Sequence, residues 1–305
     1  MNIQSSKLLI VIVLSAVVVM NGCSLPGLKG PSNNTIMVGT MNTSESQIMG
    51  HVVRLMIEHH TDLHVGMINN LGSSIVSHKA MMNKEIDISG VRYTGTDVAG
   101  SLGMEPIKDP KEAMKVVQEG FTNRFDQTWF DSYGFANSYA FTVTKKLADE
   151  KNIKTVSDLK KFAPNLRLGV DNSWIKRKGD GYEGFIKDYG FEFGHLYPMQ
   201  IGLVYKAVNS GEMDVVLAYT TDGRVKSYEL VVLEDDKRFF PPYDASPVIR
   251  NDVLEKHPEL NAILQKLVGK FSTKNMQVLN YEADGKMKEP SLVAKEFLEE
   301  NHYFD

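Results

Sequence analysis

The sequence lacks several features on which large classes of protein depend. Its 305 residues include one cysteine, Cys23, so no intramolecular disulfide can form. The formal net charge is −4 and no long run of like charge occurs, which leaves no basic surface for nucleic acid. Neither a G-x-S-x-G nor an H-E-x-x-H motif is present, which argues against two common kinds of hydrolase. What remains is an ordinary globular composition, in a chain long enough for two domains with their own cores.

The N-terminus has the features of an export signal. A lysine precedes the apolar run from Leu8 to Met20, which at roughly 13 residues is too short to span a bilayer and suits the core of a signal peptide. The run leads into Met20-Asn21-Gly22-Cys23, which resembles a bacterial lipobox except that methionine replaces the usual leucine. We expect residues 1–22 to be a lipoprotein signal peptide, Cys23 to be lipidated, and residues 23–35 to be a flexible tether. The alternative is an uncleaved signal anchor with an incidental cysteine.

Two segments of the chain resemble each other closely. Residues 79–97 and residues 206–222 both predict the end of a helix, a tight turn through an acidic pair, a short buried strand and a Tyr-Thr loop. An internal echo of this kind indicates two similar α/β lobes in one chain. Ligands of open α/β sheets bind beyond the carboxyl ends of the strands. Tyr93 and Tyr219 end the two echoed strands, so we expect a tyrosine from each lobe to face one cleft.

The order of predicted elements assigns most of the chain to these lobes. Strands alternate with helices in the rhythm of a parallel sheet, and the pattern restarts near Phe135. The C-terminal helices have no strands of their own, so we expect them to pack on the first lobe. Lobe 1 then comprises residues 36–133 and 244–305, and lobe 2 comprises residues 134–243. The two crossings, near residues 131–135 and 238–243, are the expected hinges.

Four tyrosines stand out by their placement at strand ends and crossings. Aromatic faces carry negative quadrupole potential, so several of them around one space hold a quaternary ammonium group without hydrogen bonds. The alternative is that they are ordinary half-buried tyrosines. The four candidates are Tyr93, Tyr139, Tyr219 and Tyr243.

Polar groups flank these tyrosines. The segment that contains Ser73 and Ser74 offers hydroxyls and free N–H groups at a helix start, which suits an anion such as a carboxylate, although plain helix capping explains it equally well. Further hydroxyls come from Thr94, Thr96, Thr220 and Thr221.

These motifs together resemble a known family. The segments concerned are Asn69–Ser74, Glu85–Ile88, Arg92–Asp97, Arg177–Phe185 and Tyr219–Arg224. They resemble the substrate-binding lipoproteins of Gram-positive osmoprotectant ABC importers, of the OpuC/OpuB (ProX-like) type, over essentially the whole mature chain. The resemblance implies an α/β, two-lobed type II periplasmic-binding-protein fold with two hinge crossings. It also implies capture of glycine betaine, carnitine, choline or a related trimethylammonium solute, for delivery to an ABC permease.

The resemblance also implies roles for individual residues. The four tyrosines named above match those that cage the ammonium in this family, and Thr96 matches a threonine that binds the substrate carboxylate. Relatives often carry a glutamine after the first strand that reaches the polar end of the ligand, and here Met41 occupies that place. Ser73 and Ser74 are the alternative contacts. The implied location is the outer face of the cell membrane, through the lipid anchor.

The sequence gives weaker support to three other functions. An amino-acid receptor on the same fold needs an Arg–Asp pair in the cleft, for which Arg92 with Asp97, or Asp222 with Arg224, would serve. A metal-capture lipoprotein would use histidines such as His60 and His64, but the residues between them predict a break in the helix. A porphobilinogen-deaminase-like enzyme needs a cofactor-bearing cysteine within the fold. We expect a binding protein without enzymatic activity, and without a cofactor or metal.

Overall fold

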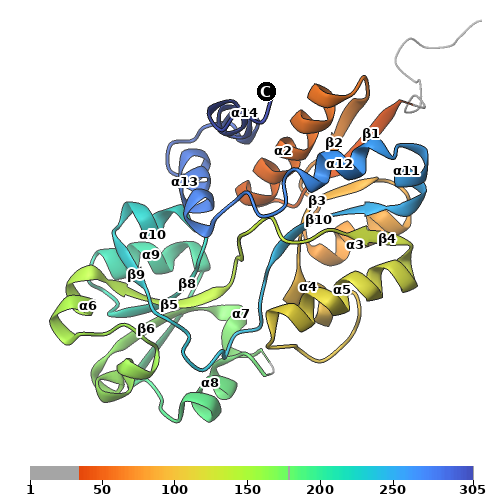
Figure 1. Ribbon diagram of the computed structural model, residues 1–305. Helices are drawn as coiled ribbons and strands as arrows, with labels where there is room; N and C mark the ends of the chain where they lie inside the picture. The colour runs from red at the N-terminus through yellow and green to blue at the C-terminus, as the bar shows by residue number, and fades with distance from the viewer. Residues whose placement is uncertain (1–33, 178, 305) are drawn as a thin grey trace, which may run out of the picture. The chain divides into compact units, whose positions relative to one another are not determined.

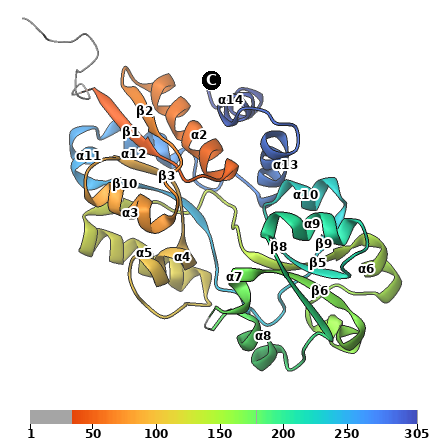
Figure 2. The ribbon, with the colours of Figure 1, turned by 180° about the vertical axis from the view of Figure 1, so that it is seen from behind.

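The computed structural model describes residues 34–177 and 179–304. Residues Ile36–Asp305 form one compact unit, which contains two five-stranded sheets (Figures 1 and 2). The predicted signal peptide, Cys23 and most of the predicted tether lie outside the described residues. Within the described part of the chain, no helix is both long and apolar enough to cross a membrane.

The first sheet has the strand order β2-β1-β3-β10-β4. β1 and β3 are parallel, whereas β10 runs antiparallel to both β3 and β4. Two hydrophobic clusters cover its two faces, one built with α2 and the C-terminal helices and the other with α3, α4 and α5. The strands are β1 (Thr35–Gly39), β2 (His64–Ile68), β3 (Ile88–Tyr93), β4 (Gln127–Trp129) and β10 (Ala245–Arg250). The helices before the crossing to the second sheet are α2 (Ser44–His60), α3 (Ser74–Met82), α4 (Thr94–Gly100) and α5 (Pro110–Phe125).

The second sheet has the strand order β7-β6-β8-β5-β9. One face packs on α6, α8 and the short helices before β6, and the other packs on α9 and α10. The strands are β5 (Tyr139–Thr144), β6 (Arg167–Asp171), β7 (His195–Met199), β8 (Val215–Tyr219) and β9 (Leu230–Val232). The α-helices are α6 (Lys145–Lys151), α7 (Asn172–Ile175), α8 (Tyr182–Tyr189), α9 (Ile201–Asn209) and α10 (Gly223–Ser227). The two 3₁₀ turns are η1 (Ser157–Lys161) and η2 (Ala163–Asn165).

The chain passes between the sheets twice, and these two crossing segments pair with each other. We call residues 130–138 the first crossing segment and residues 233–244 the second. Ala136 and Asp244 form an antiparallel bridge, and the Asn137 N–H donates to the Tyr243 carbonyl at 3.1 Å. The two-sheet α/β architecture with two crossings therefore agrees with the predicted fold class.

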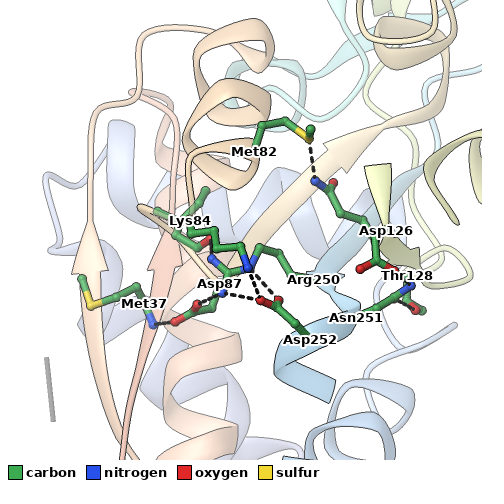
Figure 3. Close-up of polar contacts among 11 residues, drawn as sticks. Met37, Met82, Lys84, Asp87, Asp126, Thr128, Arg250, Asn251 and Asp252 are labelled. Carbon is green, nitrogen blue, oxygen red and sulfur yellow. Dashed lines mark hydrogen bonds and ion pairs between the residues drawn. The ribbon is translucent and has the colours of Figure 1, made fainter. Parts of the chain in front are cut away.

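The two similar segments predicted from the sequence are present, and they share the same kind of side-chain hydrogen bond. Asp87 precedes β3, and its carboxylate accepts the N–H of Met37 in the neighbouring parallel strand at 2.7 Å, as Figure 3 shows. Asp214 precedes β8 and accepts the N–H of Arg167 in β6 at 2.8 Å. Each aspartate also pairs with an arginine, which is Arg250 for Asp87 and Arg167 for Asp214. The same residue type thus closes the same parallel strand pair in both sheets.

The C-terminal region differs from the prediction in two respects. The sequence pattern predicts one helix from Asp252 to Phe271, but this segment is divided at Pro258 into α11 (Asn251–Lys256) and α12 (Glu259–Gln265), because proline does not continue a helix. α13 (Thr273–Asp284) and α14 (Pro290–Glu300) follow. α14 packs on α2 as expected, but α13 contacts both α2 and α10, so it links the helices of the two sheets. A Cβ on Gly223 would lie 2.5 Å from the backbone of α13, which shows how closely α10 and α13 approach.

Candidate functional site

All seven predicted ligand-binding residues line one pocket of about 420 Å³. Antiparallel pairing explains why the tyrosines converge there. Tyr139 begins β5 and pairs directly with Tyr219 at the end of β8. In the first sheet, Tyr93 at the end of β3 pairs with Ala245, two residues after Tyr243. The start of one strand therefore lies beside the end of its neighbour in both sheets, and each such junction contributes two tyrosines.

The rings of Tyr139 and Tyr219 lie close together, and burial raises the pKa of Tyr219 and of Tyr243. The ring centroids of Tyr139 and Tyr219 are 5.0 Å apart, and their hydroxyls are 3.5 Å apart. Burial, followed by the neighbouring Tyr139, raises the pKa of Tyr219. Burial raises the pKa of Tyr243 to about 12, although Arg177 opposes this shift. Neutral phenols with exposed π-faces are suited to contact with a cation.

Gly95 allows Tyr243 to approach the first sheet. A Cβ at Gly95 would lie 2.6 Å from the Pro242 carbonyl oxygen and 3.2 Å from the Tyr243 ring. Any larger residue would therefore push this tyrosine, or the second crossing segment, away from α4.

Arg177 is a pocket residue to which the sequence analysis assigned no role. Its guanidinium lies 5.5 Å from the centroid of the Tyr139 ring and donates to the Tyr243 hydroxyl at 2.8 Å. It also pairs with the buried carboxylate of Asp180 at 2.5 Å. The residue lies within one of the quoted motifs, but only the fold shows that its side chain reaches two of the tyrosines.

A second residue that sequence analysis missed is Glu45, in the first turn of α2. Its side chain is buried, and its Oε1 accepts hydrogen bonds from the Tyr93 hydroxyl at 2.5 Å and from Asn137 at 2.9 Å. Burial and this carboxylate raise the pKa of Tyr93 well above its ordinary value. In the sequence Glu45 has the appearance of an ordinary acidic residue at a helix start, which gives no signal of this contact.

The serines at the start of α3 have different environments. Ser73 is the N-cap of the helix, and its hydroxyl accepts from the Val76 N–H at 3.3 Å. Ser74 donates to the sulfur of Met41 at 3.5 Å. Both line the pocket, as do Met41 and Thr96. Helix capping therefore explains the position of Ser73, which was the alternative to a ligand-binding role.

Two of the threonine hydroxyls named in the sequence analysis bind the crossing segments. The Thr94 hydroxyl donates to the Pro242 carbonyl at 3.0 Å and accepts from the Asp244 N–H at 3.1 Å. Its counterpart Thr220 donates to the Ala136 carbonyl at 2.9 Å and accepts from an N–H of the same crossing segment. These hydroxyls bind the crossing segments and do not line the tyrosine pocket. The Tyr-Thr loop predicted after Tyr93 is also absent, because α4 begins at Thr94 itself.

The residues that other functions would require do not line the tyrosine pocket. Arg92 is fully buried and pairs with Asp97, away from the pocket. Arg224 pairs with Asp222 at 2.6 Å and lies 4.1 Å from the centroid of the Tyr205 ring. Among the described residues, no group of three or more histidine, cysteine or acidic side chains is arranged to hold a metal ion.

Comparison with known proteins identifies the family. Residues 34–300 match the model of OpuAC, the substrate-binding domain of the ABC-type glycine betaine transport system. The chain belongs to this family of substrate-binding proteins. It is 55% identical over 295 residues to the carnitine transport binding protein OpuCC of Listeria monocytogenes, covering 97% of this chain and 96% of that one. It is 33% identical to an ergothioneine transport permease/ergothioneine binding protein of Helicobacter pylori, over 87% of this chain and 47% of that longer protein.

Solved structures of substrate-binding proteins have the same architecture. The crystal structure of a glycine betaine/carnitine/choline ABC transporter protein superimposes with a TM-score of 0.86 at 58% identity, covering 88% of this chain and all of the other. A ligand-free structure of YehZ from Escherichia coli gives 0.76 at 22% identity, covering 88% of this chain and 98% of the other, and so supports the fold. The chain is thus the solute-binding component of an ABC-type transport system, a family that binds rather than transforms its substrates.

Proposed function

We propose that this protein captures a quaternary-ammonium osmoprotectant, such as carnitine, glycine betaine or choline, and presents it to an ABC permease. The observation that carries the proposal is the convergence on one pocket of four tyrosines, three from strand ends of the two sheets and one from the second crossing segment. Two of the relatives described above are named for such ligands. One is named for carnitine, and the other for glycine betaine, carnitine and choline. Each tyrosine face contributes roughly 0.5–2 kcal/mol to binding of a cation, depending on desolvation.

The polar end of a zwitterionic ligand would meet a different set of groups in the same pocket. Thr96 and Ser74 offer hydroxyls, and the Arg177 guanidinium offers a positive charge. We assign the carboxylate of the ligand to these groups and the trimethylammonium group to Tyr93, Tyr139, Tyr219 and Tyr243. In this proposal the protein acts by binding alone.

Binding would be coupled to closure of two lobes. We assign residues 36–133 with 244–305 to lobe 1 and residues 134–243 to lobe 2, with the crossing segments as hinges. A ligand that contacts tyrosines from both lobes binds the closed form better than the open form and shifts the population toward it. The closed form is the state that a permease would recognise.

The N-terminal sequence supports an extracellular location at the membrane. We propose that Cys23 is lipidated after removal of residues 1–22, and that residues 23–35 tether the binding domain. Substitution Cys23→Ala should release the protein from the membrane fraction of a Gram-positive host. Retention of the substituted protein in that fraction would contradict lipid anchoring.

The test of the ligand is isothermal titration calorimetry with the purified protein. Carnitine, glycine betaine, choline and a free amino acid are titrated separately under the same conditions. Binding of at least one trimethylammonium compound, with no heat from the amino acid, is expected. An absence of binding by all three quaternary amines would contradict the proposed ligand class, whereas a response to the amino acid alone would point to an amino-acid receptor.

A further inference from the structure

Glu45 is a buried carboxylate in an unusual electrostatic position. Only 4% of its surface is exposed, and it lies in the first turn of α2, a helix that Thr43 already caps. It lines a second pocket of about 280 Å³ that adjoins the tyrosine pocket. Residues common to both linings include Asn137 and Tyr219. Glu45 is therefore next to the proposed ligand site without being one of its predicted residues.

Three side-chain donors hold the two carboxylate oxygens. Oε1 accepts from Tyr93 and Asn137, and Oε2 accepts from the Asn280 amide at 3.0 Å. The same Asn280 nitrogen donates to the Thr221 carbonyl at 2.8 Å. Because a carbonyl oxygen only accepts, this second bond fixes the orientation of the amide and makes its nitrogen a donor to Glu45. Donors converge on Glu45 from β3, from the first crossing segment and from α13, as a carboxylate requires.

No cationic partner for this charge is found among the described residues. The ion pairs in that part of the chain do not include Glu45, and the two arginines that line the adjoining pockets are each paired with another acid. Arg177 pairs with Asp180, and Arg224 with Asp222. Buried charges in proteins are normally paired, because hydrogen bonds alone do not recover the full cost of removing a charge from water. The helix N-terminus supplies only a partial positive charge.

We propose that the quaternary ammonium of the ligand is the counter-charge of Glu45. This inference rests on the proposed function and adds a positioning residue to it. Glu45 accepts a hydrogen bond from the Tyr93 hydroxyl, which positions this tyrosine. The charge of Glu45 makes the tyrosine pocket select a cation over a neutral group of the same shape. Tyrosine faces alone also favour cations, but a full negative charge one hydrogen bond away adds a larger and longer-ranged attraction.

The decisive variant is Glu45→Gln, which keeps the shape and removes the charge. The oxygen of the new amide can still accept hydrogen bonds from Tyr93 and Asn137. The ligands are glycine betaine and 3,3-dimethylbutanoate, in which carbon replaces the charged nitrogen. Glu58→Gln is the matched control, since it removes one negative charge from the same helix at a position that lines neither pocket. Affinities are measured by calorimetry or ligand-observed NMR, and the melting temperature is measured without ligand.

We expect Glu45→Gln to weaken ligand binding without lowering the stability of the ligand-free protein. Glu45→Gln should lower the affinity for glycine betaine by about 10- to 100-fold and reduce the preference for it over 3,3-dimethylbutanoate by at least about tenfold. The ligand-free protein should melt at the same or a higher temperature, because an uncompensated buried charge is removed. Glu58→Gln should leave both the affinity and the preference for the charged ligand unchanged.

Other outcomes would overturn the inference. A variant that fails to fold, or that melts lower while losing both ligands equally, would show that Glu45 has a structural role alone. An unchanged preference in Glu45→Gln would show that its charge does not reach the ligand. If the wild-type protein itself binds no quaternary amine, the proposed function fails and this inference fails with it, whereas normal wild-type binding confines any failure to Glu45.

Discussion

Substitution Tyr219→Ala tests whether the tyrosine rings provide the binding energy. Tyr219 ends β8 at the pocket, where its ring lies 5.0 Å from that of Tyr139. A desolvated cation–π contact contributes up to about 2 kcal/mol, and loss of packing around the methyl groups adds to this. We expect a loss of about 2–3 kcal/mol, which corresponds to a roughly 30- to 150-fold weaker Kd for the bound quaternary amine.

The same substitution should cost little stability. The Tyr219 ring is only partly buried and faces the pocket, and its backbone N–H keeps the bond to the Tyr205 hydroxyl at 2.9 Å after the change. Losing the contact with Tyr139 should lower the free energy of unfolding by about 1 kcal/mol. Truncation of an aromatic residue in a closed core would cost about 3–5 kcal/mol.

Calorimetry and thermal unfolding of three variants separate these effects. Tyr219→Phe keeps the ring and loses only a 3.5 Å contact between hydroxyls, so its affinity should stay within about threefold of wild type. Tyr197→Ala removes a tyrosine that is 41% exposed on β7, outside the pocket, and should bind normally. The reasoning would be refuted if Tyr219→Ala bound the ligand within about threefold of wild type while remaining folded.

Two further predictions concern the crossing segments and the pH dependence of stability. Thr94→Val removes the two hydrogen bonds that the Thr94 hydroxyl makes to the second crossing segment, so chemical denaturation should show a loss of about 1–3 kcal/mol in the free energy of unfolding. Burial raises the pKa of Tyr243 from 10.0 to about 12. The unfolded chain therefore loses this proton at a lower pH than the folded protein. The stability that this tyrosine contributes is complete below pH 10 and should be lost as the pH rises through 12, by up to about 2–3 kcal/mol.

Matched variants isolate each effect. Thr94→Ser keeps the hydroxyl and should restore most of the stability that Thr94→Val loses; an equal loss in both would assign the effect to the methyl group. For the alkaline transition, Tyr243→Phe cannot titrate at this position, so its free energy of unfolding should decline less between pH 10 and pH 12. A decline as steep as that of wild type would assign the transition to other tyrosines.

Much of the fold could be predicted because the relevant signals are local. The echo between residues 79–97 and 206–222 predicted two similar α/β units, and the structure contains them with matching aspartates at positions 87 and 214. The C-terminal helices were predicted as elements, but the dual contact of α13 with α2 and α10 was not. A helix pattern specifies which face is apolar, and does not specify how many neighbours share that face.

The candidate site could be predicted in part. Strand ends and crossings pointed to four tyrosines, and the structure brings them into one pocket, although their role in binding stays a proposal. Thr94 and Thr220 were named as further hydroxyls beside the tyrosines, but both bind crossing segments and neither lines the tyrosine pocket. The sequence shows the type of a side chain but not the backbone group that it meets 150 residues away in the chain, as for Thr94 and Asp244.

The sequence by itself determined the kind of protein, through its two similar segments and its family motifs. Strand and helix periodicities arise from neighbours within a few residues of one another, so they can be recognised before the chain folds. Only the tertiary structure decided which charges are compensated. Glu45 meets its donors at Tyr93, Asn137 and Asn280, which are separated from it by 48, 92 and 235 positions. Hydrogen bonding and burial at such separations exist only in the folded protein, and they make an ordinary helix-start glutamate a buried charge that has no cationic partner among the described residues.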